Sequence, residues 1–182
     1  MIEDNKNDFP TINWFPGHMA KARRLIQDNL KLVDVVVELL DARIPLSSAN
    51  PMLADLIVDK PHMIALNKAD LADQIATKEW IQYFNQKNIP AVGIDSMTGK
   101  GMKLLLKTID ELAKEKVNKL VSKGVNARSA RVMILGIPNV GKSSLINKLA
   151  GAAIAKTADK PGVTRAKQWI KIGKNLDLLD TP

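Results

Sequence analysis

Short apolar runs alternate along this chain with longer segments in which apolar residues recur every three or four positions. The runs span residues 33–40, 62–66, 91–94 and 131–135. The segments of helical period span residues 17–32, 50–59, 74–88, 100–122 and 143–149. Strands that alternate with helices are typical of an α/β fold, in which helices cover both faces of a mostly parallel sheet.

The stretch after residue 167 departs from this alternation. Residues 168–172 and 176–179 are two short apolar stretches on either side of Gly173-Lys174-Asn175. A glycine-containing turn between two such stretches predicts a β-hairpin. We therefore expect a three-layer α/β domain that also contains a hairpin.

The composition limits the size and class of the protein. A chain of 182 residues with 46% hydrophobic content can bury the core of one ordinary domain. Residues 1–10 are polar and are expected to form a flexible tail, so the predicted domain spans residues 11–182. Cysteine is absent, which excludes disulfides and thiolate metal sites and fits a reducing cytosol. No run approaches the roughly 20 apolar residues that cross a bilayer, and we expect a cytoplasmic monomer without membrane contact.

A phosphate-binding loop lies between the apolar run 131–135 and the helical segment that follows. Gly136 to Ser143 match Gly-x-x-x-x-Gly-Lys-Ser in full. Backbone N–H groups of such a loop surround a β-phosphate, and the helix N-terminus adds positive charge. We expect Lys142 to reach the β- and γ-phosphates as a catalytic group and Ser143 to bind Mg²⁺. The residues predicted to contact the nucleotide here are Asn139, Val140, Gly141, Lys142, Ser143 and Ser144. A chance match in a strand–turn–helix unit is the alternative.

Asn67-Lys68-Ala69-Asp70, directly after the second apolar run, predicts guanine recognition. A carboxylate at Asp70 accepts from N1–H and from the exocyclic amine of guanine, a pair of donors that adenine lacks. We expect Asn67 to reach the purine edge and to brace the phosphate loop. The aliphatic part of Lys68 is expected to cover the base.

The order of the motifs is the most specific signal in the sequence. Asp95 and Ser96, one apolar run after the guanine motif, are expected to line the other side of the base. In most guanine-nucleotide switches the phosphate loop comes first, whereas here residues 67–70 precede residues 136–143. The order indicates a circularly permuted GTPase. An ATP-using P-loop enzyme such as a kinase is the alternative, and the Asn-Lys-x-Asp loop argues against it.

Two further positions are candidates for the magnesium site. Thr164 lies in Lys160-Pro161-Gly162-Val163-Thr164-Arg165 and is a candidate second ligand, recruited when a γ-phosphate is present. A Pro-Gly turn in a surface loop is the other interpretation of this segment. Asp180, at the end of an apolar strand, is a candidate outer-sphere partner of Mg²⁺.

Positive charge is concentrated in one part of the chain. Residues 1–113 carry a net charge of −2 and residues 114–182 a net charge of +10. A basic region of this kind is typical of a surface that faces a polyanion, and a solvated basic face is the alternative. Aromatic residues make up only 4% of the chain, which argues against base stacking and favours contact with a nucleic-acid backbone.

Together these motifs resemble the circularly permuted GTPases of ribosome assembly. The resemblance rests on residues 14–22, 41–45, 67–70, 136–144 and 180–182, and it covers about residues 12–182. It implies a P-loop NTPase fold and a cytosolic GTPase that binds GTP and GDP. It also implies a role late in assembly of the large ribosomal subunit, with the subunit precursor and its rRNA as partners.

The resemblance also gives two residues a role. Asn139 matches the position that holds K⁺ beside the phosphates in potassium-activated GTPases, where the cation neutralises charge on the transferred phosphoryl group. Stabilisation of a tight loop is the alternative for Asn139. His18 lies in Pro16-Gly17-His18-Met19, which resembles the catalytic-histidine region of the family. A structural role or an RNA contact is the alternative for His18.

The chain departs from the family pattern at Pro182, where an Asp-x-Pro-Gly motif is expected to continue with glycine. We therefore expect a domain that is incomplete at its C-terminus and lacks the second switch and a C-terminal RNA-binding domain. The primary hypothesis is a GTP-hydrolysing assembly factor that binds rRNA in a nucleotide-dependent way. The alternative is a nucleotide-sensing RNA-binding module with negligible intrinsic hydrolysis.

Overall fold

The computed structural model describes residues 16–122, 128–151, 168–172 and 176–180. The strands are β1 (Val35–Asp41), β2 (His62–Asn67), β3 (Ala91–Gly93), β4 (Ala130–Leu135), β5 (Gln168–Ile172) and β6 (Leu176–Asp180). The helices are α1 (Pro16–Leu30), α2 (Pro45–Ser48), α3 (Pro51–Ile57), α4 (Gln74–Gln86), α5 (Met102–Val121) and α6 (Lys142–Ala150). The expected tail at residues 1–10 lies outside the described residues.

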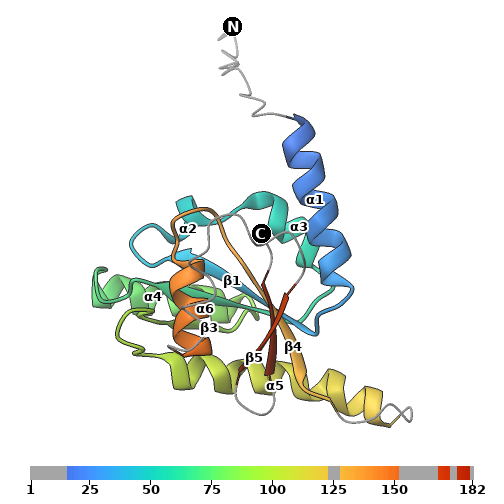
Figure 1. Cartoon of the computed structure of the whole chain (residues 1–182). Helices are drawn as coiled ribbons and strands as arrows, with labels where there is room; N and C mark the ends of the chain where they lie inside the picture. Colours follow the sequence, from blue (N-terminus) through green and yellow to red (C-terminus); the bar gives the residue numbers. More distant parts are fainter. Residues whose placement is uncertain (1–15, 123–127, 152–167, 173–175, 181–182) are drawn as a thin grey trace, which may run out of the picture.

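The six strands form one sheet in the order β3-β2-β1-β4-β6-β5 (Figure 1). Every neighbouring pair is parallel except β5 and β6, which pair antiparallel as the predicted hairpin requires. The turn expected at residues 173–175 lies outside the described part of the chain. The predicted α/β fold with a mostly parallel sheet is confirmed.

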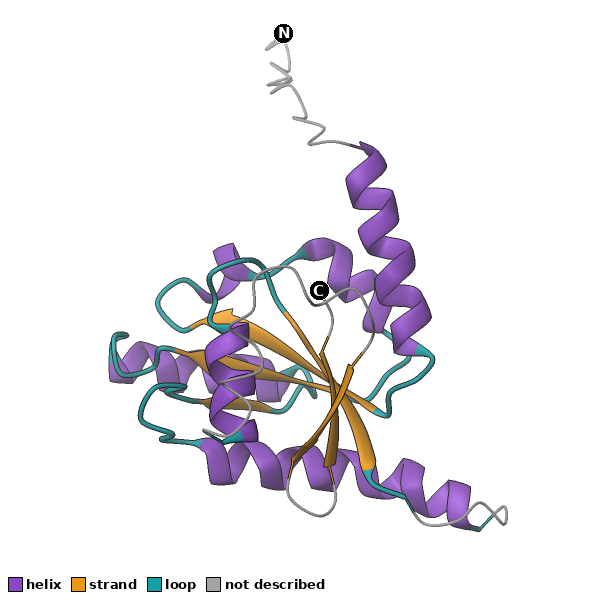
Figure 2. Ribbon diagram, viewed as in Figure 1, coloured by secondary structure: helices purple, strands orange, loops and turns teal. Residues whose placement is uncertain are grey.

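Helices cover both faces of the sheet, as Figure 2 shows. On one face, Leu105 of α5 and Leu145 of α6 pack with Val37 of β1. On the other face, Leu53 of α3 packs with Val36 of β1, and α1 and α4 add their own apolar side chains. Successive residues of a strand point to opposite faces, so β1 contributes to both cores and is buried along its whole length. None of the described helices is both long enough and apolar enough to span a membrane.

The first strand begins two residues later than the sequence predicts. It starts at Val35 and not at residue 33. Asp34 accepts a hydrogen bond from the backbone N–H of Arg131 (2.9 Å) and two from the guanidinium of Arg128 (2.7 and 3.0 Å). The backbone N–H of Asp34 also donates to the carbonyl of Arg131 (2.7 Å), so the side-chain bonds reinforce this end of the β1–β4 pair.

The short helix α2 was not predicted, because four residues are too few to show a helical period. It begins with Pro45, whose fixed φ suits the first helical position. The hydroxyl of Ser48 donates to the carbonyl of Pro45 (3.0 Å) and accepts from the backbone N–H of Asp41 (2.9 Å). A single buried hydroxyl therefore fastens α2 to the end of β1.

Glu38 is a buried carboxyl group in the middle of β1, with 8% of its surface exposed. Burial raises the pKa of Glu38, while the charge of His62 and the backbone N–H of Asn50 oppose the shift. A carboxyl whose pKa is higher in the folded state binds its proton more tightly there. The folded state therefore loses stability as the pH rises through the range in which Glu38 ionises.

We expect Glu38→Gln to gain stability relative to the parent chain as the pH rises from about 4 to about 8, because the glutamine cannot ionise. The measurement is the free energy of unfolding in urea for both proteins at several pH values. The two proteins should differ least at the acidic end, where Glu38 is protonated in both states. Parallel stability profiles across the whole range would contradict the raised pKa.

Candidate nucleotide-binding site

The sheet brings the three sequence motifs to one edge. Strands β2, β1 and β4 are parallel neighbours, so their carboxyl ends lie side by side. β2 leads into residues 67–70 and β4 leads into residues 136–141. β3, the parallel neighbour of β2, leads into residues 94–99. Ligands of open α/β sheets bind at this edge, outside the carboxyl ends of the strands.

The phosphate loop is wrapped around the ammonium group of Lys142. Its Nζ donates to the carbonyl of Gly136 (2.7 Å) and to the carbonyl of Ile137 (2.9 Å). Burial lowers the pKa of this lysine. Gly141 precedes the first residue of α6 and has a φ of 100°, which favours glycine. The helix N-terminus and a lysine are thus directed at the same small space, and Ser143 is exposed beside them.

Asn67 joins three loops through one side-chain amide. Its Nδ2 donates to the carbonyl of Val140 in the phosphate loop (2.8 Å). Its Oδ1 accepts from the backbone N–H of Ser96 (3.1 Å) and from the Ser96 hydroxyl (2.7 Å). This is the bracing contact that the sequence predicts for Asn67. The second hydrogen of Nδ2 is a further donor that this bond does not use.

Lys68 connects the guanine motif to the phosphate loop by a second route. Its Nζ donates to the carbonyl of Asn139 (2.9 Å) and to Oδ2 of Asp41 (2.9 Å). Lys68 and Asn139 both adopt a positive φ, of 60° and 68°. Asp70, three residues after Asn67, is exposed. The backbone geometry therefore turns the lysine inward and leaves the carboxylate at the surface.

The carboxylate of Asp95 is used within its own turn. Oδ1 accepts from the backbone N–H groups of Met97 (2.8 Å) and Thr98 (3.2 Å), and Oδ2 accepts from the Thr98 hydroxyl. These hydrogen bonds, that of the Thr98 hydroxyl first, lower the pKa of Asp95. Asp95 thus shapes the loop, and Ser96 is the residue of this motif that contacts Asn67.

Lys148 and Thr98 hold the same loop and were missed in the sequence. Nζ of Lys148, on α6, donates to the carbonyl of Met97 (3.0 Å). Lys148 and Met97 are far apart in the chain, and no motif or spacing in the sequence connects them. Asp41 belongs to the 41–45 segment on which the family resemblance partly rests, but it was not assigned to the site.

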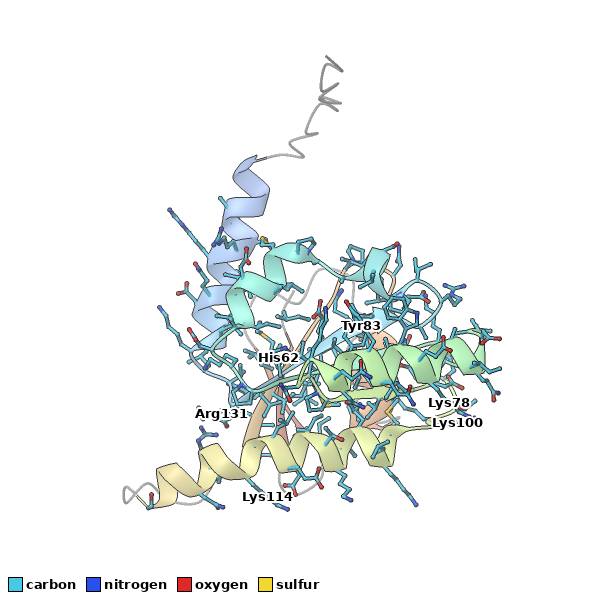
Figure 3. All side chains as sticks on the ribbon, turned by 180° about the vertical axis from the view of Figure 1, so that it is seen from behind. His62, Lys78, Tyr83, Lys100, Lys114 and Arg131 are labelled. Carbon is cyan, nitrogen blue, oxygen red and sulfur yellow. The ribbon has the colours of Figure 1, made fainter. Side chains whose placement is uncertain are left out.

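A cavity of about 300 Å³ borders Asp70 on the side of α4. Thr77 and Lys78 of α4 line it together with Asp95 and Lys100. Figure 3 shows Lys78 and Lys100 at the same end of the molecule. The residues that line the cavity include Ala69 and Asp70 but none of the phosphate loop.

The structure does not describe the side chains of three predicted site residues, His18, Thr164 and Asp180. Thr164 lies outside the described residues. Asp180 ends β6, which runs parallel to β4, so its backbone reaches the same edge as the phosphate loop. His18 lies in the first turn of α1, and the N-terminal end of that helix projects away from the sheet (Figure 1).

Gly141 and Gly151 flank α6 and allow a matched comparison. A Cβ on Gly141 would lie 2.3 Å from Nδ2 of Asn67, whereas a Cβ on Gly151 would meet no atom within 4 Å. Both glycines have a positive φ, of 100° and 80°. Gly151→Ala should therefore cost about 1–3 kcal/mol of backbone strain alone.

We expect Gly141→Ala to lower the free energy of unfolding by more than Gly151→Ala, because it also displaces Asn67 from its bonds. Each such bond contributes about 0.5–1.5 kcal/mol. Urea unfolding of both variants is the measurement. Equal losses for the two variants would show that Asn67 does not brace the loop.

The chain is similar to proteins of known family. Residues 131–182 match the protein family described as 50S ribosome-binding GTPase. Ribosome biogenesis GTPase A of Bacillus cereus is 58% identical over 171 residues, which cover 94% of this chain and 58% of that protein. Ribosome biogenesis GTPase A of Thermotoga maritima is 36% identical over the same length, with the same two coverages. The chain thus spans 58% of the length of these relatives.

Solved structures agree with the sequence relatives. The structure described as GNP-bound YlqF from T. maritima has a TM-score of 0.63 and 34% identity, and the match covers 89% of this chain and 57% of that one. The GDP-bound structure of the same protein has a TM-score of 0.57 and 33% identity. These matches agree with a P-loop GTPase sheet on which the guanine motif precedes the phosphate loop in sequence, and the chain is similar to these GTPases over most of its own length.

Proposed function

We propose that this chain binds GTP and GDP and hydrolyses GTP as an assembly factor of the large ribosomal subunit. The observation that carries the proposal is the hydrogen bond from Asn67 to the carbonyl of Val140 (2.8 Å), which joins the guanine motif to the phosphate loop. That bond spans 73 positions of sequence and connects two motifs whose order along the chain is reversed.

The phosphates bind at the start of α6. Backbone N–H groups of residues 139–144 surround the β-phosphate, and the helix dipole adds to their field. Lys142 exchanges its two carbonyl partners for phosphate oxygens that carry full negative charge, a stronger class of hydrogen bond. The carbonyls of Gly136 and Ile137 lose this donor when the nucleotide binds.

Guanine binds between the loops that follow β2 and β3. The exposed carboxylate of Asp70 accepts from N1–H and the exocyclic amine. The stem of Lys68 covers one face of the base, and its ammonium stays on the Asn139 carbonyl. Ser96 and Asn67 shape the opposite side.

The residues present fit a magnesium ion held jointly with the nucleotide. Ser143 offers an exposed hydroxyl beside Lys142, and hydroxyl and phosphate oxygens are ligands that Mg²⁺ prefers. No group of three or more His, Asp or Glu side chains that could hold a metal is found in the part of the chain that the structure describes. When bound, the ion neutralises charge on the β- and γ-phosphates. Thr164 and Asp180 are the further residues proposed to hold it.

Asn139 is the residue proposed to hold K⁺. Its carbonyl already accepts from Lys68, so the oxygen left to bind a cation is that of its exposed side chain.

The reaction is in-line attack of water on the γ-phosphate, which is catalysed mainly by positioning of the reactants and by stabilisation of charge. His18 and Thr164 are proposed to orient the attacking group.

A role in ribosome assembly is supported by the relatives named ribosome biogenesis GTPase A and by the family described as 50S ribosome-binding GTPase. The net charge of +10 in residues 114–182 suits contact with rRNA. Two arginines of this region have partners within the protein: Arg128 pairs with Asp34, and Arg131 lies over the ring of Trp169 (5.0 Å). Lys114 and Lys148 also have partners within the protein, so the exposed Lys171 of β5 is the better candidate among the described residues for the RNA backbone. The proposed compartment is the cytoplasm.

We expect this chain to bind fluorescent GDP and GTP in the presence of excess ATP, and Lys142→Ala to lower that affinity about 100-fold, since charge-assisted bonds are worth about 1.5–3 kcal/mol each. Lys107→Ala is the control, because Lys107 is 72% exposed on α5 and pairs only with Glu111 in the ion pairs described. Binding that ATP abolishes would overturn the guanine assignment.

Hydrolysis is tested separately by measuring phosphate release with and without ribosomal subunits, in K⁺ and in Na⁺. Turnover that subunits stimulate, and that falls when Na⁺ replaces K⁺, is the expected outcome. Nucleotide binding without turnover under either condition would favour the nucleotide-sensing RNA-binding module.

A further inference from the structure

The sequence Asp41-Ala42-Arg43 ends β1 but has no part in the binding scheme above. Its strand lies between β2, which leads to the guanine motif, and β4, which leads to the phosphate loop. Asp41 is in register with Asn67, and the N–H of Ala42 donates to the Asn67 carbonyl (2.8 Å). The Asp41 side chain is only 6% exposed. The backbone therefore fixes a buried carboxylate next to the guanine motif.

That carboxylate binds two cations. Arg43 donates from Nε to Oδ1 (2.9 Å) and from Nη2 to Oδ2 (2.7 Å), and its backbone N–H donates to Oδ1 (3.1 Å). Lys68 donates from Nζ to Oδ2 (2.9 Å). These contacts, those of Arg43 first, hold the pKa of Asp41 well below its usual range. Asp41 is therefore ionised at every pH at which the protein is expected to work.

Through Lys68 the carboxylate reaches the phosphate loop. The same ammonium that binds Asp41 donates to the carbonyl of Asn139 (2.9 Å). A lysine with a flexible four-carbon stem is held in one position only when its donors have fixed partners. Loss of Asp41 would leave one of these two contacts, so both the stem over the base and the loop carbonyl would be held less firmly.

Arg43 lies two residues beyond the end of β1 and Asp70 three residues beyond the end of β2, and these two strand ends are in register. The Arg43 side chain is 47% exposed. Its pKa is raised first by the hydrogen bonds and charge of Asp41 and, to a smaller extent, by the charge of Asp70. Asp70 is the carboxylate assigned to guanine, and it lies within electrostatic reach of this guanidinium. Released from Asp41, Arg43 would compete with guanine for Asp70.

We propose that Asp41 is a positioning residue for guanine recognition, which holds Lys68 on the phosphate loop and keeps Arg43 from pairing with Asp70. The proposal rests on the proposed nucleotide-binding function. If the Asp41–Arg43 ion pair had only a structural role, its loss would not be expected to change base selectivity.

The same strand provides a matched control. Asp34, at the opposite end of β1, is also buried and also binds an arginine through two hydrogen bonds, at 2.7 and 3.0 Å. Asp34→Asn removes a buried charge pair of the same kind, far along the strand from the nucleotide motifs. Any effect of Asp41→Asn that comes only from lost stability should appear in Asp34→Asn as well.

The experiment measures the dissociation constants of GDP and of inosine diphosphate, which lacks the exocyclic amine that Asp70 accepts from. We expect Asp41→Asn to weaken GDP binding about tenfold and to reduce the preference for GDP over inosine diphosphate. Adding Arg43→Ala to Asp41→Asn should restore the preference, because Asp70 is again free. Asp34→Asn should lower the melting temperature and change neither quantity.

Two results would overturn the proposal. One is Asp41→Asn with unchanged GDP affinity and preference; the other is Asp34→Asn with the same loss as Asp41→Asn. If Asp41→Asn does not fold, Lys68→Met and Arg43→Ala decide the question in the parent background. Lys68→Met must lower GDP affinity at an unchanged melting temperature, and Arg43→Ala must leave the preference intact. A parent chain that binds neither nucleotide would instead overturn the proposed function.

Discussion

The side-chain amide of Asn67 is the contact on which the site depends. It is 2% exposed, and its oxygen and nitrogen bind two different loops. A buried amide without partners is costly, so the loops after β3 and β4 are stabilised in the one arrangement that satisfies it. Strand order and not chain order decides which loops meet, because parallel neighbours end at the same edge. A permuted chain can therefore build the pocket of an unpermuted one.

Three lysines reinforce this arrangement by the same means. The ammonium groups of Lys142, Lys68 and Lys148 donate to backbone carbonyls of the phosphate loop or of the loop after β3. Turns that expose N–H groups to an anion leave carbonyls pointing away, and these need donors. Each lysine satisfies such carbonyls and adds positive charge at the edge of the sheet where phosphates are proposed to bind. The same side chains therefore stabilise the loops and concentrate positive charge at this edge of the sheet.

The strands and the motif-bearing loops were predictable because both follow short-range rules: an apolar run, a fixed spacing and a glycine where the backbone must turn. α2 was not predictable, since four residues carry no period. The use of the Asp95 carboxylate in its own turn depends on the Thr98 side chain and was invisible to spacing. Lys148 and Asp41 act across distances that a single sequence does not encode. Local sequence patterns were enough to predict the motifs. The order of strands in the sheet was needed to show which motifs lie next to one another.

The three carboxyl groups of β1 show how one buried strand carries charge. Asp34 and Asp41, at its two ends, each bind an arginine through two hydrogen bonds. Glu38, between them, has a raised pKa because burial outweighs the charge of His62. The arginine side chains that pair with Asp41 and Asp34 stay 47% and 30% exposed, so each buried carboxylate at a strand end is paired with a cation that reaches solvent. The strand is therefore least tolerant of charge at its centre and firmly ionised at Asp41. That end adjoins the loops after β2 and β4, so a fixed negative charge there can organise Lys68 and Arg43, whose hydrogen bonds outweigh the desolvation of the carboxylate.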